Sequence, residues 1–239
     1  MNSNIFGSML IIAGTTIGAG MLALPLASAG LGFPTAITIM ILIWALMSYT
    51  ALLMIEVHQH APTDATLHSL ALKLLGRKGQ IVASGAMIFL FYALCAAYIA
   101  GGGEQLSSRL IDDMGFNVPA QTGAIIFTLL IGSIVCVGTH SVDLINRGLF
   151  ILKLIALVLM LGFMFPHVQT VHLLEMPMEQ GLIIAALPVI FTSFGFHGSI
   201  PSIVKYLGKD TKVLRKVMLV GSSLPLIVYI LWQIASKVP

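Results

Sequence analysis

The sequence predicts an all-α integral membrane protein with seven spans, and three observations support this fold class. Of the 239 residues, 58% are hydrophobic and only 9% are charged, and the mean hydropathy is +1.01. A water-soluble domain does not have this composition. The apolar residues fall into seven long stretches, and two of these carry helix-weakening residues near their middle. The segments between the stretches are too short to form a soluble domain.

Each apolar stretch is close to the length that a membrane helix needs, since about 20 apolar residues cross the hydrocarbon core of a bilayer. We expect the spans near residues 5–27, 33–55, 81–103, 122–137, 148–166, 182–204 and 217–234. An alternative for the first stretch is a cleaved signal peptide that ends near Ala27-Ser28-Ala29. Residues 1–4 carry no basic side chain, however, and the stretch is longer than the apolar region of a signal peptide, so we favour a span.

The basic residues predict the sidedness of the chain, because Lys and Arg concentrate on the cytoplasmic side of a membrane. If the amino terminus is cytoplasmic, every Lys and Arg except Arg109 and Lys237 falls in a cytoplasmic segment. Glu56, with His58 and His60 after it, lies at the cytoplasmic end of the second span and is expected to be solvated. No basic surface is interleaved with aromatic residues, so we expect no nucleic-acid partner.

Motifs for enzymatic or metal chemistry are not found in the sequence. It has no His-Glu-x-x-His zinc motif, no Gly-x-Ser-x-Gly elbow and no phosphate-binding Gly-x-x-x-x-Gly-Lys loop. Cys95 and Cys136 both fall inside apolar spans, where buried free thiols are expected. We therefore predict neither an enzyme nor a metal site.

The first interrupted span contains Gly14, Gly18 and Gly20 beside Thr15 and Thr16. A glycine weakens a helix by about 1 kcal/mol relative to alanine, so this stretch is predicted to unwind within the membrane. The freed carbonyl groups would suit a cation, and the freed N–H groups would suit a carboxylate. The alternative is that Gly14 and Gly18 form a close-packing face against another helix. The stretch alone does not choose between these interpretations.

The second interruption lies in the sixth span, where Pro188 precedes Phe194-Gly195-Phe196-His197-Gly198 and Pro201 follows. The two interrupted spans are five apart and run in opposite directions, as two inverted five-span repeats require. We expect residues 1–166 to form the first repeat and residues 167–239 to begin the second. Backbone breaks at bilayer depth must face protein, water or a ligand, and small-molecule transporters use them as binding sites.

Residues 13–25 and 193–206 resemble the aromatic amino acid permeases of bacteria, and the resemblance extends through essentially the whole chain. It implies a leucine-transporter-like fold in the bacterial inner membrane. It also implies uptake of an aromatic amino acid, with tyrosine as the favoured substrate. The proton gradient would drive this uptake, and no bound cofactor is expected. In that fold spans 1, 2, 6 and 7 form a moving bundle, and spans 3, 4, 8 and 9 form the scaffold.

Against the family pattern, the second repeat is incomplete, because spans 8 onward are absent. We therefore expect impaired transport unless a partner chain supplies them. The alternative is a non-transporting fragment, or a membrane protein with an assembly or regulatory role.

The resemblance also implies a substrate site between the two interruptions. The carboxylate would meet the N–H groups of the unwound first span, at Ile17, Gly18, Ala19 and Gly20. The ammonium group would meet carbonyl groups near Ala13, Gly14, Ser193 and Phe194. The aromatic side chain would stack on Phe194 and Phe196. The alternative for these two rings is ordinary core or lipid contact.

Two residues are candidates for proton coupling. His197 lies in the sixth-span interruption, where an imidazole needs a partner and titrates near physiological pH. It would relay a proton or bind the substrate, or it would only satisfy a freed carbonyl group. Lys153 lies in the fifth span, where some proton-coupled relatives place an ammonium group. The alternative for Lys153 is that its side chain reaches to the cytoplasmic headgroups.

Overall fold

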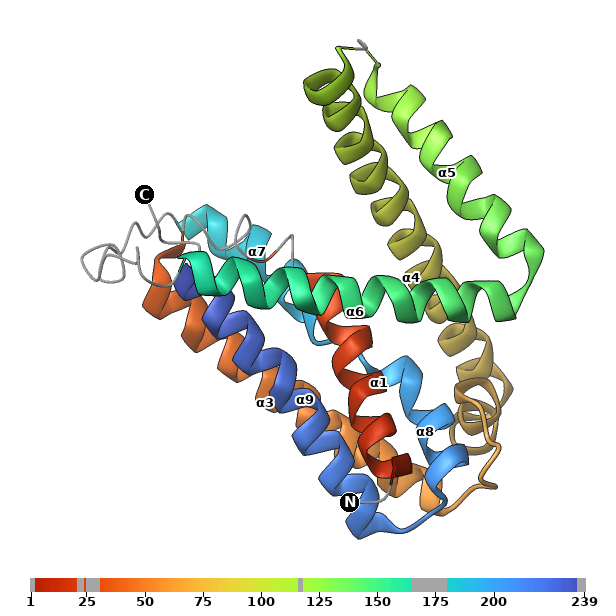
Figure 1. Cartoon of the computed structure of the whole chain (residues 1–239). Helices are drawn as coiled ribbons and strands as arrows, with labels where there is room; N and C mark the ends of the chain where they lie inside the picture. The colour runs from red at the N-terminus through yellow and green to blue at the C-terminus, as the bar shows by residue number, and fades with distance from the viewer. Residues whose placement is uncertain (1–2, 21–23, 25–30, 116–117, 165–179, 236–239) are drawn as a thin grey trace. The chain divides into compact units, whose positions relative to one another are not determined.

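The structure is a computed structural model that describes residues 3–20, 24, 31–115, 118–164 and 180–235. The described part of the chain is helical and contains no strand, so the all-α prediction is confirmed (Figure 1). The elements are α1 (Ser3–Gly20), α3 (Phe33–Gln59), α4 (Leu67–Met114), α5 (Ala120–Val137), α6 (Thr139–Met164), α7 (Gln180–Ser193), the 3-10 helix η4 (His197–Ser199), α8 (Ile200–Leu207) and α9 (Thr211–Ala235). Within α4, Gly76 has a φ of 69° and interrupts the helical backbone.

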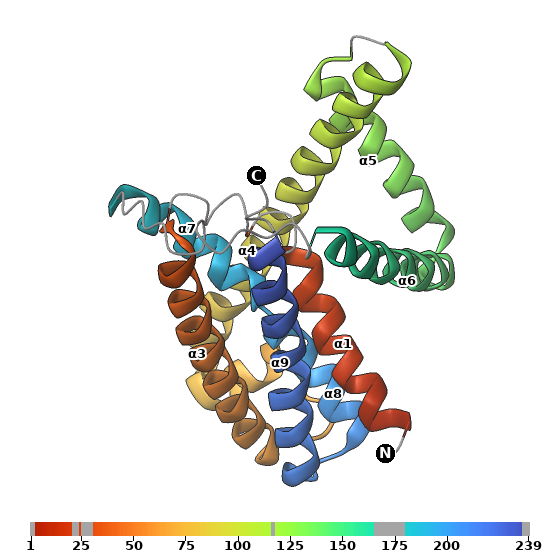
Figure 2. The same cartoon turned by 60° about the vertical axis from the view of Figure 1, so that its left-hand side comes forward.

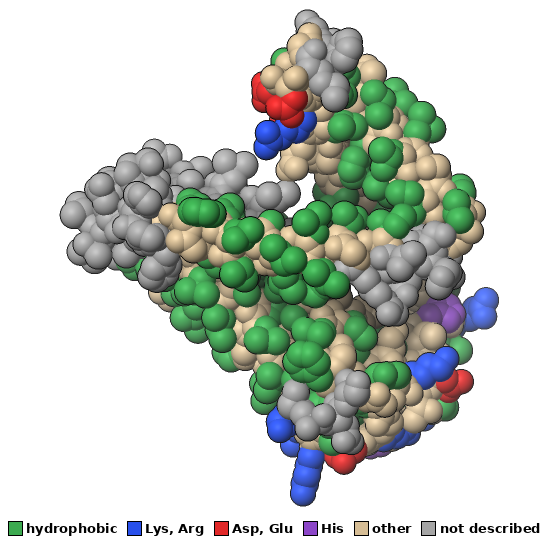
Figure 3. All heavy atoms as spheres, in the orientation of Figure 1, with side chains coloured by type: hydrophobic (Ala, Val, Ile, Leu, Met, Phe, Trp, Pro, Cys, Tyr) green, Lys and Arg blue, Asp and Glu red, His purple; other side chains and the backbone are tan. Residues whose placement is uncertain are grey.

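Five helical segments among the described residues are long and apolar enough to cross a membrane. They are Phe33–Gln59, Leu67–Asp113, Ala120–Val137, Ala186–Leu207 and Thr211–Ala235, and the shorter apolar helices Asn4–Ile17 and Gly148–Met164 accompany them. An apolar helix therefore lies in each predicted stretch, although the number of seven spans is not confirmed. Large apolar side chains such as Leu42 and Phe89 are exposed, and hydrophobic side chains cover much of the face in Figure 3. Such a surface suits lipid contact.

The chain divides into two compact units. Unit 1 contains residues 1–70 and 155–239, and unit 2 contains residues 71–154. In unit 1, α9 packs against both α1 and α3, and α1 also packs against α7, as Figure 2 shows for the first three helices. Unit 1 thus gathers the predicted spans 1, 2, 6 and 7, together with the second part of α6 from the predicted fifth span. The expected repeat boundary at 166/167 lies outside the described residues.

Unit 1 has two apolar cores. One joins α1, α3, α8 and α9 and includes Ile12, Ile55, Phe196 and Val217. The other joins α3, α7 and α9 around Phe194 and Tyr229. The two halves of the interrupted sixth span therefore contribute to different cores, because Phe194 and Phe196 belong to different clusters.

Unit 2 contains most of α4, all of α5 and the first part of α6. Helices α4 and α5 approach closely where Gly103 lies against the backbone of Ala124. The Ser107 hydroxyl donates a hydrogen bond to the Pro119 carbonyl at 3.3 Å. Cys95 and Cys136 are free but exposed, so the expectation of buried thiols was wrong. An apolar thiol is stable at a surface that contacts lipid.

Charged side chains at one end of unit 1 connect α3 to α8 and α9. The Arg215 guanidinium donates to the Glu56 carboxylate at 3.0 Å, and the Lys209 ammonium donates to the Gln59 carbonyl at 3.3 Å. Glu56 is exposed, as expected for a solvated group. His58, two residues further along α3, is fully buried and donates from Nδ1 to the Met54 carbonyl at 2.8 Å.

We expect the Glu56–Arg215 ion pair to contribute little to stability. About half of each side chain is exposed (54% for Glu56 and 50% for Arg215), and exposed pairs are typically worth about 0.2–1 kcal/mol. A double-mutant cycle with Glu56→Gln and Arg215→Gln, followed by denaturation in detergent, should give a coupling energy in this range. A coupling above about 2 kcal/mol would contradict the assignment of a weak exposed pair.

Candidate functional site

The sixth span is interrupted where the sequence predicted it. Helix α7 ends at Ser193, and α8 begins at Ile200 with Pro201 in its first turn. Between them the backbone makes only short-range hydrogen bonds, from Phe194 N to Phe191 O (3.2 Å), Gly195 N to Thr192 O (3.0 Å) and Phe196 N to Phe194 O (3.1 Å). Pro201 has no N–H group to donate to the preceding turn, and the first turn of a helix does not require one.

Pro188 does not cause this interruption by itself. It lies inside α7, which continues for another five residues to Ser193. The helix ends instead at the Phe-Gly-Phe-His-Gly segment, residues 194–198. This segment contains two glycines, and a proline follows shortly after it.

The first span does not unwind over residues 13–20, so this prediction was wrong. Helix α1 is continuous from Ser3 to Gly20. The Thr15 and Thr16 hydroxyls donate to the carbonyls of Ile11 and Ile12, each at 2.7 Å, a pattern compatible with a helix interior. The N–H groups of residues 17–20 belong to the helix and are not free to hold a carboxylate. Packing of α1 against α7 and α9 outweighs the weak helix propensity of its glycines.

The two glycine-rich stretches nevertheless meet in space. A Cβ atom built on Gly20 would lie 2.5 Å from both the Ser193 Oγ and the Tyr229 Oη. Farther along, the Thr15 and Ser199 hydroxyl oxygens are 3.4 Å apart. Close packing therefore explains the need for glycine at position 20. The structure brings α1 together with both sides of the sixth-span interruption.

Tyr229 of α9 lies at this meeting point, and sequence reasoning missed it. Its hydroxyl is 2.6 Å from the Thr16 carbonyl, to which it donates, and 3.2 Å from the Ser193 carbonyl. The side chain is fully buried, and its ring packs edge-to-face on Phe194 with centroids 5.5 Å apart. A buried tyrosine usually finds a partner for its hydroxyl, but the sequence did not show which one.

Replacing Tyr229 by phenylalanine is expected to lower the free energy of unfolding by about 0.5–1.5 kcal/mol, the usual net value of one hydrogen bond. The aromatic packing would remain, while the Thr16 and Ser193 carbonyls would lose their shared donor. Denaturation of the purified chain in detergent measures this change. Tyr49→Phe is a matched control, since Tyr49 is 60% exposed. Equal stabilities of the two variants would contradict the role given to the Tyr229 hydroxyl.

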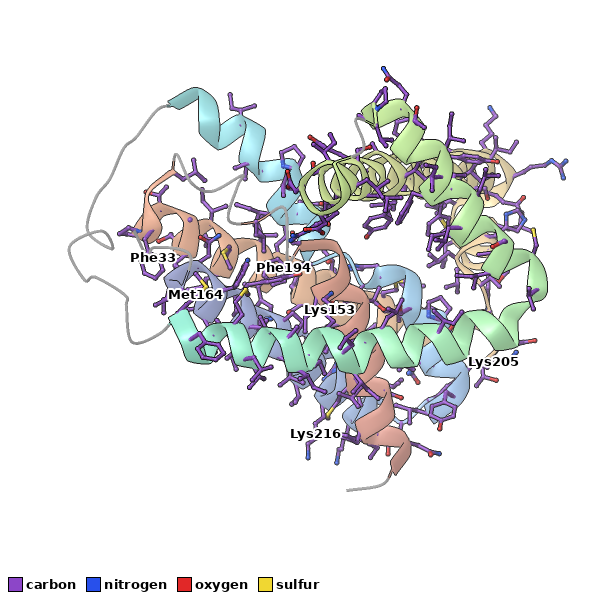
Figure 4. All side chains as sticks on the ribbon, turned by 45° about the horizontal axis from the view of Figure 1, so that its top comes forward. Phe33, Lys153, Met164, Phe194, Lys205 and Lys216 are labelled. Atoms are coloured by element: carbon purple, nitrogen blue, oxygen red, sulfur yellow. The ribbon has the colours of Figure 1, made fainter. Side chains whose placement is uncertain are left out.

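The other predicted substrate residues are largely buried in unit 1. Ala13, Ile17, Ser193, Phe194 and Phe196 are each at most 3% exposed. Figure 4 shows Phe194 among the helices of unit 1 and Lys216 toward the edge. For the two phenylalanine rings, the structure shows core contact, while stacking on a substrate stays a prediction. Gly14 is partly buried, and Gly18 and Ala19 are described only as helical backbone.

His197 is held by a residue that the sequence did not indicate. Its Nε2 atom is 2.9 Å from the hydroxyl oxygen of Thr50 on α3. The ring stacks on Phe196, with centroids 5.3 Å apart and an interplanar angle of 26°. The imidazole is therefore hydrogen-bonded to the Thr50 hydroxyl and not to a freed carbonyl group.

Lys153 lies on α6 in unit 2, where its side chain is partly buried (Figure 4). Lys153 belongs to unit 2, which is described by itself. Both interpretations of Lys153 stay predictions.

An open apolar groove of about 440 Å³ runs beside Pro188 and is lined by Ile43, Ile184, Leu187, Pro188, Phe191 and Thr192. Thr192 contributes a hydroxyl group to the lining of this groove, and this hydroxyl already donates to the Pro188 carbonyl at 2.9 Å. The groove therefore offers little to a charged amino acid. The polar meeting point of α1, α7 and α9 is the better candidate site.

The apolar outer surface and the long apolar helices, one of them interrupted, are those of a multi-pass membrane protein. The chain belongs to the tryptophan/tyrosine permease family, which it matches over residues 1–237. This is a family of transporters and not of enzymes.

Two relatives from Haemophilus influenzae cover 99% of this chain. The tyrosine-specific transport system 1 is 46% identical to it, and the tyrosine-specific transport system 2 is 44% identical. The glutamine transporter 2 of Aliivibrio fischeri is 33% identical over 98% of the chain. The chain spans 58% of the length of the two tyrosine-specific relatives and 61% of the third. No solved structure matches it significantly.

Proposed function

We propose that this chain imports tyrosine across the bacterial inner membrane by proton symport and alternating access. The observation that carries the proposal is the interrupted sixth span. Helix α1 approaches it at the buried Ser193, where α7 ends, and at Ser199, beyond the break. Membership of the permease family and the likeness to two tyrosine-specific transport systems support the choice of substrate.

The proposed substrate residues are Ala13, Gly14, Ser193, Phe194 and Phe196. The ammonium group would lie near Ser193, where α7 ends, because the carbonyl end of a helix favours positive charge. The aromatic side chain would lie toward Phe194 and Phe196. The helical N–H groups of residues 17–20 are no longer proposed as carboxylate donors, since α1 does not unwind there.

His197 and Lys153 remain the proposed proton-coupling residues. His197 is the stronger of the two, because it lies within the interrupted segment and is held by both Thr50 and Phe196. For Lys153, the support is limited to its place in an apolar helix and its partial burial.

A leucine-transporter-like bundle with a cytoplasmic amino terminus is part of the proposal. Its support is that unit 1 gathers the helices expected for the moving bundle. Its basic side chains also gather where α1 and α9 begin, as the lower part of Figure 3 shows. The basic residues there include Lys209, Lys212, Arg215 and Lys216. This end would face the cytoplasm.

Uptake of radiolabelled tyrosine tests the proposal, in cells that lack their own aromatic amino acid carriers and express this chain. We expect uptake that a protonophore abolishes and that unlabelled tyrosine competes more strongly than glutamine. The second candidate is a non-transporting membrane protein with an assembly or regulatory role. A chain that inserts normally but gives no uptake would favour this candidate.

A further inference from the structure

The contact between Thr50 and His197 determines where the imidazole carries its proton. The Thr50 hydroxyl has one proton, and its oxygen lies 3.0 Å from the Leu46 carbonyl and 3.1 Å from the Met47 carbonyl. A carbonyl oxygen only accepts, so the hydroxyl donates in that direction. Its lone pairs are then left to accept a hydrogen bond from His197 Nε2, 2.9 Å away.

This arrangement selects one form of the neutral ring. A neutral imidazole has one N–H group, and the other nitrogen carries a lone pair. With the proton on Nε2, the contacts of Thr50 and His197 are satisfied together. The reverse form would direct the Thr50 proton at Nε2 and away from the two carbonyls. It would also place a proton on Nδ1, which has no recorded acceptor among the described residues.

The ring is also held in a defined place within the interrupted segment. Phe196 stacks on it, and Ser199 of the same 3-10 helix lies 3.4 Å from the Thr15 hydroxyl of α1. The Nδ1 atom is therefore a positioned hydrogen-bond acceptor in the interrupted segment.

Tyrosine and tryptophan, the two amino acids in the family's name, each carry a side-chain hydrogen-bond donor that such an acceptor can bind. Tyrosine carries a phenol O–H and tryptophan an indole N–H, while phenylalanine has no side-chain donor. We propose that Thr50 is a positioning residue that holds His197 with its proton on Nε2, so that Nδ1 accepts a hydrogen bond from the side-chain donor of the substrate. The pair then favours tyrosine and tryptophan over phenylalanine. The selectivity half of this inference rests on the proposed function.

The first experiment reads the proton position directly and does not depend on transport. The full chain is labelled with ¹⁵N in its histidine rings, and the His197 signals are assigned by their loss in His197→Gln. We expect the alkaline wild-type spectrum to show the proton on Nε2. Thr50→Ser should preserve this form, and Thr50→Val should populate the other. Thr38→Val is the matched control, since the Thr38 hydroxyl on the same helix donates to the Pro34 carbonyl. A wild-type proton on Nδ1, or an unchanged spectrum in Thr50→Val, overturns the inference.

The second experiment measures competition of phenylalanine and tyrosine against bound radiolabelled tyrosine in the purified chain. We expect Thr50→Val to reduce the preference for tyrosine by about 3- to 10-fold, the value of one hydrogen bond, while Thr50→Ser and Thr38→Val retain it. Unchanged selectivity in Thr50→Val overturns the substrate half of the inference. If the proton position responds but the wild-type chain binds no tyrosine, the proposed function fails and the role of Thr50 in holding the ring stands.

Discussion

A Gly20→Ala variant is expected to lose tyrosine uptake and to unfold more easily than the wild type. The added Cβ would lie 2.5 Å from the Ser193 and Tyr229 hydroxyl oxygens and 2.6 Å from the Ser193 Cβ. Neither neighbour can move easily, because both are fully buried and the Tyr229 hydroxyl is bound to the Thr16 carbonyl. Overpacking of this kind typically costs about 1–3 kcal/mol. It would also separate α1 from the sixth-span interruption.

The measurements are the thermal midpoint in detergent and the uptake of radiolabelled tyrosine. Gly7→Ala on the same helix is the matched control, since a Cβ at Gly7 would meet no atom within 4 Å. The control is expected to be neutral or slightly stabilising, because alanine favours a helix over glycine. A Gly20→Ala chain as stable and as active as Gly7→Ala would show that the close approach of α1 to Ser193 is not needed.

A His197→Ala variant is expected to abolish uptake while membrane insertion persists. The change removes the Thr50 contact, the stacking on Phe196 and the imidazole proposed to take part in coupling. Because His197 is only partly buried, the loss of packing should be modest. Transport should therefore suffer more than folding.

Initial uptake rates across a range of pH, compared at equal amounts of inserted protein, test this prediction. His60→Ala provides a control, since His60 is exposed at the end of α3. Wild-type kinetics and pH dependence in His197→Ala would remove His197 from the mechanism. Loss of insertion would instead assign it a structural role.

Of the two spans predicted to be interrupted, the sixth is interrupted and the first is not over residues 13–20, for a physical reason. In the sixth span, Gly195, Gly198 and Pro201 act on the backbone of their own segment, so local composition was enough to locate the break. In the first span, the glycine content predicted a similar break, but the structure has a continuous helix there. There the helix persists because residues far along the chain pack against it, including Tyr229, which lies 213 positions after Thr16.

The partners of functional side chains were beyond sequence reasoning for the same reason. Thr50 lies 147 positions before His197, and nothing in its local sequence separates it from other threonines that bond within their helix. His58 is likewise buried on α3, which its local sequence did not indicate.

By itself, the sequence determined that this is an all-α membrane protein, where its apolar helices lie, which family it resembles, and that residues 194–199 leave the helix. These properties depend on hydrophobicity and backbone preference, which act over a few neighbouring residues. Only the tertiary structure decided that α1 stays helical through Gly20, that Tyr229 joins α1, α7 and α9, and that Thr50 holds His197. Each of these depends on contacts between helices distant in the chain, and packing energy there exceeds local preference.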